Sequence, residues 1–189
     1  MAPRFTTPDR HDYTPRQQAM YDRFTTGPRA DPSAPFRLFD ADGTLIGPPS
    51  IWVLSPEVGF ALSGIGHQMR WGIGFSERTR EAVILAVGHT LDSPFELFAH
   101  VPAARAVGIG DAELEAIAAG AVPEGADAEM RVGLEVAWEV LATGTLDDDA
   151  YARAAEVFGI EGLFQLVALI TYYRMVATQL AVFGVLPPA

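Results

Sequence analysis

The chain has 189 residues, 49% of them apolar and 20% charged, a composition typical of a single folded domain. Its formal net charge is −11 and all thirteen basic residues are Arg, so we expect neither nucleic acid nor an anionic membrane as a partner. The chain contains no Cys, which excludes disulfides, thiolate nucleophiles, iron–sulfur clusters and cysteine zinc sites.

The first thirteen residues are polar, and we predict a flexible N-terminus over 1–13 followed by one domain over 14–189. They contain no apolar core of signal-peptide length, so we predict a cytoplasmic protein. Thr14 and Pro15 begin a predicted helix that runs to about residue 26. After a loop, Asp42-Gly43 separates two short β-compatible pieces, the pattern of a hairpin.

From residue 50 onward the sequence predicts helices with clear start and stop signals. One helix begins at Ser55 and ends near Trp71, and Ser76 begins the next. The later helices begin at Ser93, Asp111, Asp127 and Asp147, and Gly159 separates the last of these from a long apolar helix. The sequence therefore predicts an all-α, single-domain bundle of about six to eight helices.

The apolar C-terminal run, LFQLVALITYYRMVATQLAVFGVL, resembles a membrane span in length. A span needs about 20 predominantly apolar residues and tolerates a central Arg poorly. Gln165, Arg174 and Gln179 interrupt this run. The sequence therefore favours a helix buried in the core or at a subunit interface.

The stretch SPFELFAHVPAA places Glu96 and His100 one helical turn apart among apolar neighbours. In one interpretation Ser93 and Glu96 form a capping box, in which Glu96 accepts the backbone N–H of Ser93. In the other, Glu96 and His100 satisfy each other or line a cavity, because the surrounding residues offer no polar face. Pro102 predicts a bend just after His100. The spacing alone leaves both interpretations open.

Other common sites lack their signatures. Glu96 and His100 are too few to bind a metal, and Glu81, His67 and His89 add no ligand-spaced motif, so we predict no metal. The motif GxSxG is absent, which argues against a serine hydrolase. The Gly-rich SGIGHQMRWGIGF follows no predicted strand, so we expect no dinucleotide and no other cofactor.

Three segments together resemble the carboxymuconolactone decarboxylase and alkylhydroperoxidase D-like superfamily. They are FRLFDADGTLIGPPSIWVLSPEVGFAL, SERTREAVILAVGHTLDSPFELFAHVPAARAVGIGDAELEAIAAG and FQLVALITYYRMVATQL, within about residues 14–185. The centre of the resemblance is Glu96-x-x-x-His100, followed by Pro, small residues and Gly108. The resemblance implies a helical bundle of the alkylhydroperoxidase D-like type that forms a homo-oligomer, a trimer or a hexamer.

The peroxidase-like branch of this superfamily carries CxxCxxxH, and its two Cys positions fall on Ser93 and Glu96 here. Without a thiol we expect no thiol peroxidase activity. The branch similar to the lactone decarboxylases keeps the Glu–His pair, as this chain does. Glu81 falls where thiol-bearing relatives place a proton-relay glutamate. The alternative is a half-exposed helix carboxylate paired with Arg78 or Arg80.

The leading hypothesis is a cofactor-independent lyase, similar to a decarboxylase, or an isomerase acting on a small organic acid or lactone. His100 is the natural proton donor, and Glu96 would orient the ring or act as the base. Candidates for binding the anionic substrate are Arg80, Arg105 and Arg174. The alternative is a non-catalytic oligomeric scaffold or a ligand-binding member of the family. A ligand-sized pocket lined by Glu96 and His100 would favour the enzyme.

Overall fold

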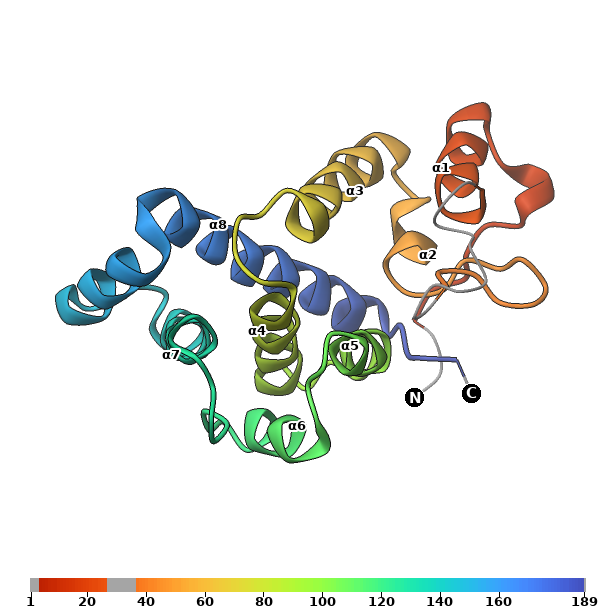
Figure 1. The fold of residues 1–189 in the computed structure, drawn as a ribbon. Helices are drawn as coiled ribbons and strands as arrows, with labels where there is room; N and C mark the ends of the chain where they lie inside the picture. Colours follow the sequence, from red (N-terminus) through yellow and green to blue (C-terminus); the bar gives the residue numbers. More distant parts are fainter. Residues whose placement is uncertain (1–3, 27–36, 189) are drawn as a thin grey trace.

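The computed structural model describes residues 4–26 and 37–188, and over these residues the fold is all-α (Figure 1). The elements in chain order are η1 (Arg10–Asp12), α1 (Pro15–Thr25), α2 (Pro48–Trp52), α3 (Pro56–Trp71), α4 (Glu77–Thr90), α5 (Pro94–Ala106), α6 (Asp111–Ala118), α7 (Ala128–Thr143) and α8 (Asp148–Phe183). The prediction of an all-α fold is confirmed.

Side-chain caps begin several of these helices where the sequence predicted them. Thr14 and Gln17 form a capping box at the start of α1. The side chains of Ser76, Asp127 and Asp147 each accept the backbone N–H three residues later, at the starts of α4, α7 and α8. Such a cap contributes about 0.5–2 kcal/mol, so these boundaries follow from local sequence.

The predicted hairpin is reduced to one isolated antiparallel bridge, between Phe39 and Leu45. The carboxylate of Asp40 accepts the backbone N–H groups of Asp42 and Thr44, at 3.0 and 2.8 Å, and this holds a tight turn. Strand pairing cannot extend further along the chain because Pro48 begins α2 almost at once.

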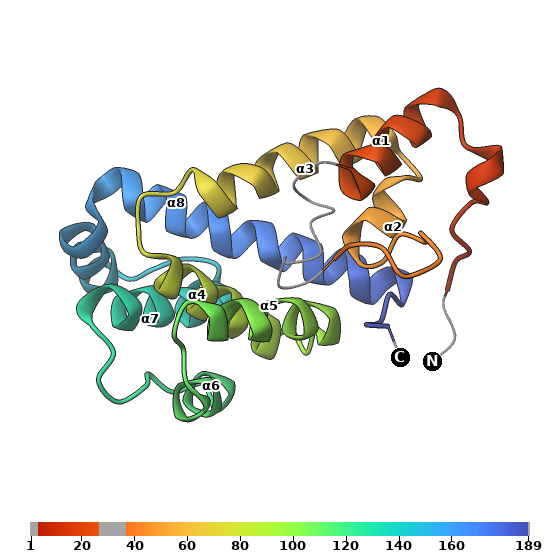
Figure 2. The same ribbon diagram turned by 45° about the vertical axis from the view of Figure 1, so that its right-hand side comes forward.

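The long helix α8 runs through the molecule and separates two groups of helices (Figures 1 and 2). α3 lies on one side with α1 and α2 near its N-terminal end, and α4, α5 and α7 lie on the other side. α4 contacts α5, α6, α7 and α8, and residues 81–88 of α4 are all buried. α4 is therefore the central helix of the bundle.

The predicted break at Gly159 is present as a kink, at which two helical segments of α8 meet. Gly159 has φ 67° and ψ 171°, a conformation that favours glycine, and helix continues on both sides. In the described residues α8 is the one helix long and apolar enough to cross a membrane, by length and composition only. A stripe of its side chains that includes Leu166, Leu169 and Ile170 packs in the core.

The buried apolar residues form two clusters. The larger one joins α4 and α7 to the first half of α8. The smaller one joins α1 and α2 to Phe95 of α5 and Val176 of α8. Residues 4–13 lie near the smaller cluster, where the backbone N–H of Arg4 donates to the carbonyl of Phe183 at 3.4 Å. The candidate site lies between the two clusters.

Candidate active site

A cavity of about 480 Å³ lies between α3, α4, α5 and α8, and residues of α1 and α2 close one end of it. Its volume falls in the range of pockets that bind small molecules. Glu81, Glu96 and His100 all line it. A ligand-sized pocket lined by Glu96 and His100 is the feature that favours an enzyme over a scaffold, and this cavity is such a pocket.

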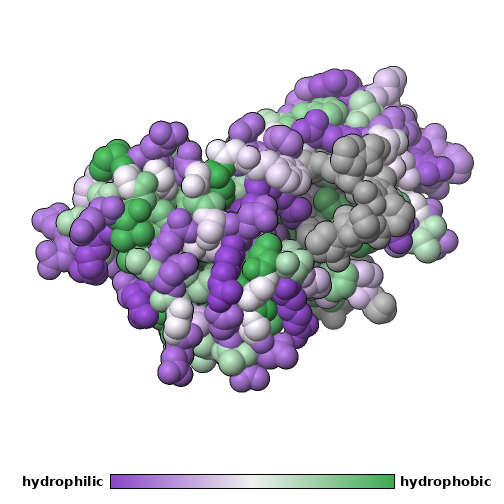
Figure 3. All heavy atoms as spheres, in the orientation of Figure 1, coloured by the Kyte–Doolittle hydropathy of each residue, from purple (hydrophilic) through white to green (hydrophobic). Residues whose placement is uncertain are grey.

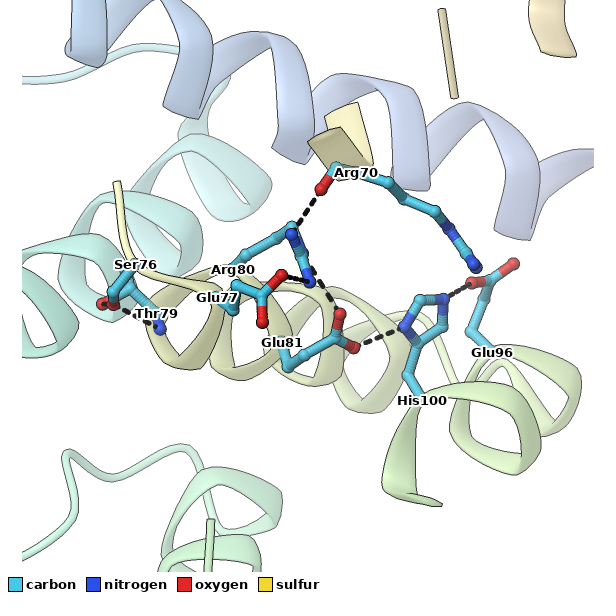
Figure 4. A network of polar contacts seen from close by, with 8 residues as sticks. All are labelled: Arg70, Ser76, Glu77, Thr79, Arg80, Glu81, Glu96 and His100. Atoms are coloured by element: carbon cyan, nitrogen blue, oxygen red, sulfur yellow. Dashed lines mark hydrogen bonds and ion pairs between the residues drawn. The ribbon is translucent and has the colours of Figure 1, made fainter. Parts of the chain in front are cut away.

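Glu81 of α4 and His100 of α5 form a hydrogen bond in which Nδ1 lies 2.7 Å from Oε2 (Figure 4). Only 4% of Glu81 and 2% of His100 is exposed. Burial alone would raise the pKa of Glu81, but His100, Arg80 and Arg70 outweigh it and hold that pKa below its ordinary value. Glu81 is therefore ionised, and it fixes the ring by accepting the Nδ1 proton.

Glu96 lies on the opposite edge of the imidazole. Its Oε2 is 3.6 Å from Nε2 of His100, and only 3% of the residue is exposed. Burial raises the pKa of Glu96, and the attraction of His100 and Arg70 opposes this rise only in part. The two carboxylates flanking one ring thus have pKa values shifted in opposite directions, the pattern that separates proton-accepting from proton-donating groups.

The capping box predicted at Ser93 is not formed. The backbone N–H of Ser93, which Glu96 would have accepted, instead donates to the carbonyl of Gly88 at 2.9 Å. The side chain of Ser93 makes no cap hydrogen bond either. The carboxylate of Glu96 instead faces His100, so that interpretation of the spacing was wrong.

Glu81 also differs from the simpler alternative, a half-exposed carboxylate. It is buried, and it pairs with His100 as well as with Arg80, whose Nε lies 3.2 Å from Oε1. Arg78 pairs elsewhere, with Glu113. The carboxylate of Glu81 is therefore part of the cavity wall.

The three arginines proposed for substrate binding lie in different places. Arg80 lines the cavity, donates to the backbone carbonyl of Arg70 and lies 3.6 Å from Glu77. Arg105 pairs with Asp111 at 2.8 Å on the surface, and Arg174 is exposed on α8. Neither Arg105 nor Arg174 lines the cavity.

Two cavity residues beside His100 and Glu96 were missed by sequence reasoning. Arg70 of α3 extends its guanidinium toward Glu96 and His100 (Figure 4). Burial would lower its pKa, but Tyr173, Glu81 and Glu96 outweigh burial and raise it. Tyr173 of α8 is buried and places its ring edge-on to the imidazole, with centroids 5.1 Å apart. The sequence signal was weak: an Arg that ends a Gly-rich helix and a Tyr inside an apolar run.

The other two histidines considered as ligands do not line the cavity. His67 is exposed, and its ring lies at a tilt beside that of Trp71, with centroids 4.8 Å apart. Burial lowers the pKa of His89. Across residues 4–26 and 37–188 no group of three or more acidic or histidine side chains is arranged to hold a metal ion.

Residues 56–139 match the model of the carboxymuconolactone decarboxylase family. The matched segment begins at α3, extends into α7 and includes Arg70, Arg80, Glu81, Glu96 and His100. No curated protein matches the chain. The segment that carries the imidazole and both carboxylates of the cavity is therefore similar to the carboxymuconolactone decarboxylase family.

Proposed function

We propose that this protein is a cofactor-independent lyase or isomerase that transfers a proton on an organic acid or lactone. The observation that carries the proposal is the row Glu81–His100–Glu96, with contacts of 2.7 and 3.6 Å, along the wall of a ligand-sized cavity. Buried titratable groups with opposite pKa shifts in a cavity are typical of acid–base sites. The match of residues 56–139 to the family model supports an activity of the kind found in this superfamily and does not identify the substrate.

In this proposal Glu81 is a positioning residue. It holds Nδ1 of His100, so the ring presents Nε2 toward Glu96 and the cavity. From the sequence we expected Glu96 to orient the ring, but the hydrogen bond at 2.7 Å supports Glu81 in that role. Glu96 and His100 are then the two catalytic residues that exchange protons with the substrate.

For a carboxylated lactone the proposed step is decarboxylation. The bond between the ring carbon and the carboxylate breaks, carbon dioxide leaves, and the electron pair remains as an enolate. Protonated His100 donates its Nε2 proton to carbon, which forms the new C–H bond. The carboxylic acid of Glu96 returns a proton to His100, and water restores Glu96. Proton transfer by a positioned side chain contributes about 10²–10⁴-fold in rate.

An isomerase would use the same groups without loss of carbon dioxide. Ionised Glu96 or neutral His100 would remove a proton from a carbon beside a carbonyl group, and the protonated partner would donate its own proton to another carbon. A proton transfer between Glu96 and His100 would then restore both groups. Both reactions pass through an enolate, whose negative charge needs a cation nearby. Arg70 is the cation best placed for this role, because its side chain extends toward Glu96 (Figure 4).

The proposal is tested by deuterium uptake from D₂O at C3 of 3-phenylpyruvate, an enolisable acid, followed by NMR. We expect uptake above the uncatalysed rate with the wild-type protein, and a loss of about 10²-fold or more with His100→Gln. Glu113→Gln, which changes a carboxylate outside the cavity, is the control. Release of carbon dioxide from carboxymuconolactone distinguishes the lyase from the isomerase. Equal uptake with His100→Gln and the wild type would contradict both.

We also propose that the protein is a homo-oligomer, a trimer or a hexamer. Large apolar side chains are exposed around the kink of α8, among them Ile160 and Phe164, and 73% of Phe164 is exposed. Figure 3 shows apolar atoms on this face of the molecule, on the left, where Figure 1 has the first part of α8. Burying such a surface stabilises association. A monomer in light scattering at micromolar concentration would contradict this proposal.

A further inference from the structure

One end of the cavity is built by residues outside the segment that matches the family. Phe24 of α1, Trp52 of α2 and Leu38 of the preceding turn all line it. Phe95 of α5 and Val176 of α8 complete this end, and these two belong to the same apolar cluster as Phe24 and Trp52. The end of the cavity that α1 and α2 close is therefore apolar, and three of its side chains are aromatic.

Specific contacts fix this apolar end in place. Nε1 of Trp52 donates to Oε1 of Gln179 on α8 at 2.9 Å. Nε of Arg23 on α1 donates to Oγ of Ser63 on α3 at 2.7 Å. These bonds tie α1 and α2 to the helices of the bundle, so the apolar wall is preformed rather than assembled around a ligand.

The backbone before α2 is fixed just as tightly. Gly47 has φ 63°, and a Cβ atom there would lie 2.0 Å from Cζ of Phe95. Only glycine allows the chain to pass this close to the ring. Phe95 precedes Glu96 on α5, so the residue that supports α2 is adjacent in sequence to a proposed catalytic residue.

The charged groups of the cavity lie among further apolar residues, such as Ala99, Ala103 and Val107. Arg70, Glu96 and His100 line the cavity, whereas Phe24, Trp52 and Phe95 form the apolar end. A volume of about 480 Å³ is in the range of pockets for drug-sized ligands, and so exceeds what a small acid head group alone requires. Aromatic walls favour a ring, which gains edge-on and offset contacts beyond its buried area.

We infer that the substrate is an amphipathic organic anion with an apolar, ring-containing group. Its acidic head would lie at Arg70, Glu96 and His100, and its ring would lie between Phe24, Trp52 and Phe95. This inference rests on the proposed function for the position of the head. The N-terminal elements α1 and α2 therefore determine specificity, and the segment that matches the family supplies the proton chemistry.

The inference is tested by the binding of 3-phenylpropionate and propionate to the full chain, measured by calorimetry. Neither acid can be decarboxylated or enolised readily, so the comparison reports binding alone. We expect 3-phenylpropionate to bind at least about tenfold more tightly. Trp52→Ala and Phe24→Ala should each remove most of that preference. Tyr151→Ala, which truncates an exposed aromatic residue outside the cavity, should keep it.

Thermal melts and the milder variants Trp52→Phe and Phe24→Leu separate lost binding from lost folding. These variants should fold and should reduce the preference by a smaller factor. Equal binding of the two acids by the wild type would overturn the inference, and so would a preference that survives in folded variants at both positions.

The failure of the proposed function gives a different result. Suppose that the preference for 3-phenylpropionate is present but 3-phenylpyruvate takes up no deuterium above the uncatalysed rate. The inference about the apolar end is then supported, and the proposed proton transfer is contradicted. If uptake depends on His100 but the two acids bind equally, the proposed proton transfer is supported and the inference about the apolar end is contradicted.

Discussion

Nδ1 of His100 lies 2.7 Å from Oε2 of Glu81, a residue nineteen positions earlier in the chain and on a different helix. This hydrogen bond connects α5 to the central helix α4 at the cavity wall. It also determines which edge of the ring meets Glu96. The arrangement of the site therefore depends on the packing of α4 against α5 as well as on the spacing within α5.

Glu96→Gln should stabilise the protein increasingly as pH rises. The folded state raises the pKa of Glu96 above the ordinary value of 4.5, so folding favours the protonated form. The stability that this gives is present below the unfolded pKa and is lost as pH rises through the folded pKa. The neutral amide avoids this loss. Thermal melts at several pH values from about 4 to 8 measure the difference. A variant that loses stability relative to wild type as pH rises would contradict the burial argument.

Ser93→Ala should lower the free energy of unfolding by less than the loss of a helix cap would. A helix cap that uses its side chain contributes about 0.5–2 kcal/mol, but the side chain of Ser93 makes no such bond. We expect less than about 0.5 kcal/mol, measured by urea unfolding. Ser76→Ala is the matched control, because Ser76 does cap α4 and its loss should show the full cost. Equal costs for the two changes would show that the cap at Ser93 forms in solution.

Arg70→Lys should weaken the binding of an organic anion. A guanidinium presents a planar fork of donors that matches a carboxylate, and an ammonium group does not. We expect about a tenfold weaker binding of 3-phenylpropionate, measured by calorimetry. Arg105→Lys and Arg174→Lys should leave affinity unchanged, because neither residue lines the cavity. An effect of Arg174→Lys as large as that of Arg70→Lys would contradict the assignment of Arg70 as the residue that binds the anion.

Gly47→Ala should destabilise the protein by more than the cost of backbone strain alone. A residue forced into a rare backbone conformation costs about 1–3 kcal/mol. At Gly47 the added Cβ also meets the ring of Phe95, so α2 must shift. Gly125→Ala is the control, since Gly125 has φ 78° and open space around the position of a Cβ. Urea unfolding should show the larger loss at Gly47, and similar losses would mean that α2 does not pack closely on Phe95.

The helices could be predicted because their signals are local. Caps such as Asp127 and Asp147 and the periodicity of Val83, Ile84 and Val87 act within one or two turns. Gly159 was recognised as a break followed by a long apolar helix, and the structure has a kink there with helix on both sides. The hairpin prediction was only partly met, because Pro48 leaves too little chain for pairing.

The candidate site could be predicted only in part. Glu96 and His100 share one helix, so their spacing places them together. Glu81 came from the family resemblance and Arg80 from its charge, and Glu81 meets His100 only through the packing of α4 against α5. Arg70 and Tyr173 lie on α3 and α8, and no local pattern indicates that those helices converge there. Arg105 and Arg174 were proposed for the site because of their charge, but neither lines the cavity. Charge alone does not fix the direction in which a side chain points.

The most direct test of the proton-transfer claim is deuterium uptake into 3-phenylpyruvate by Glu96→Gln, His100→Gln and the double variant. Glu96→Gln preserves shape and removes the ionisable group, so uptake should fall about 10²-fold or more, a barrier change of about 2.7 kcal/mol. The double variant should be far less than multiplicatively worse, because the two residues act as a unit. A folded Glu96→Gln protein with wild-type uptake would contradict the account.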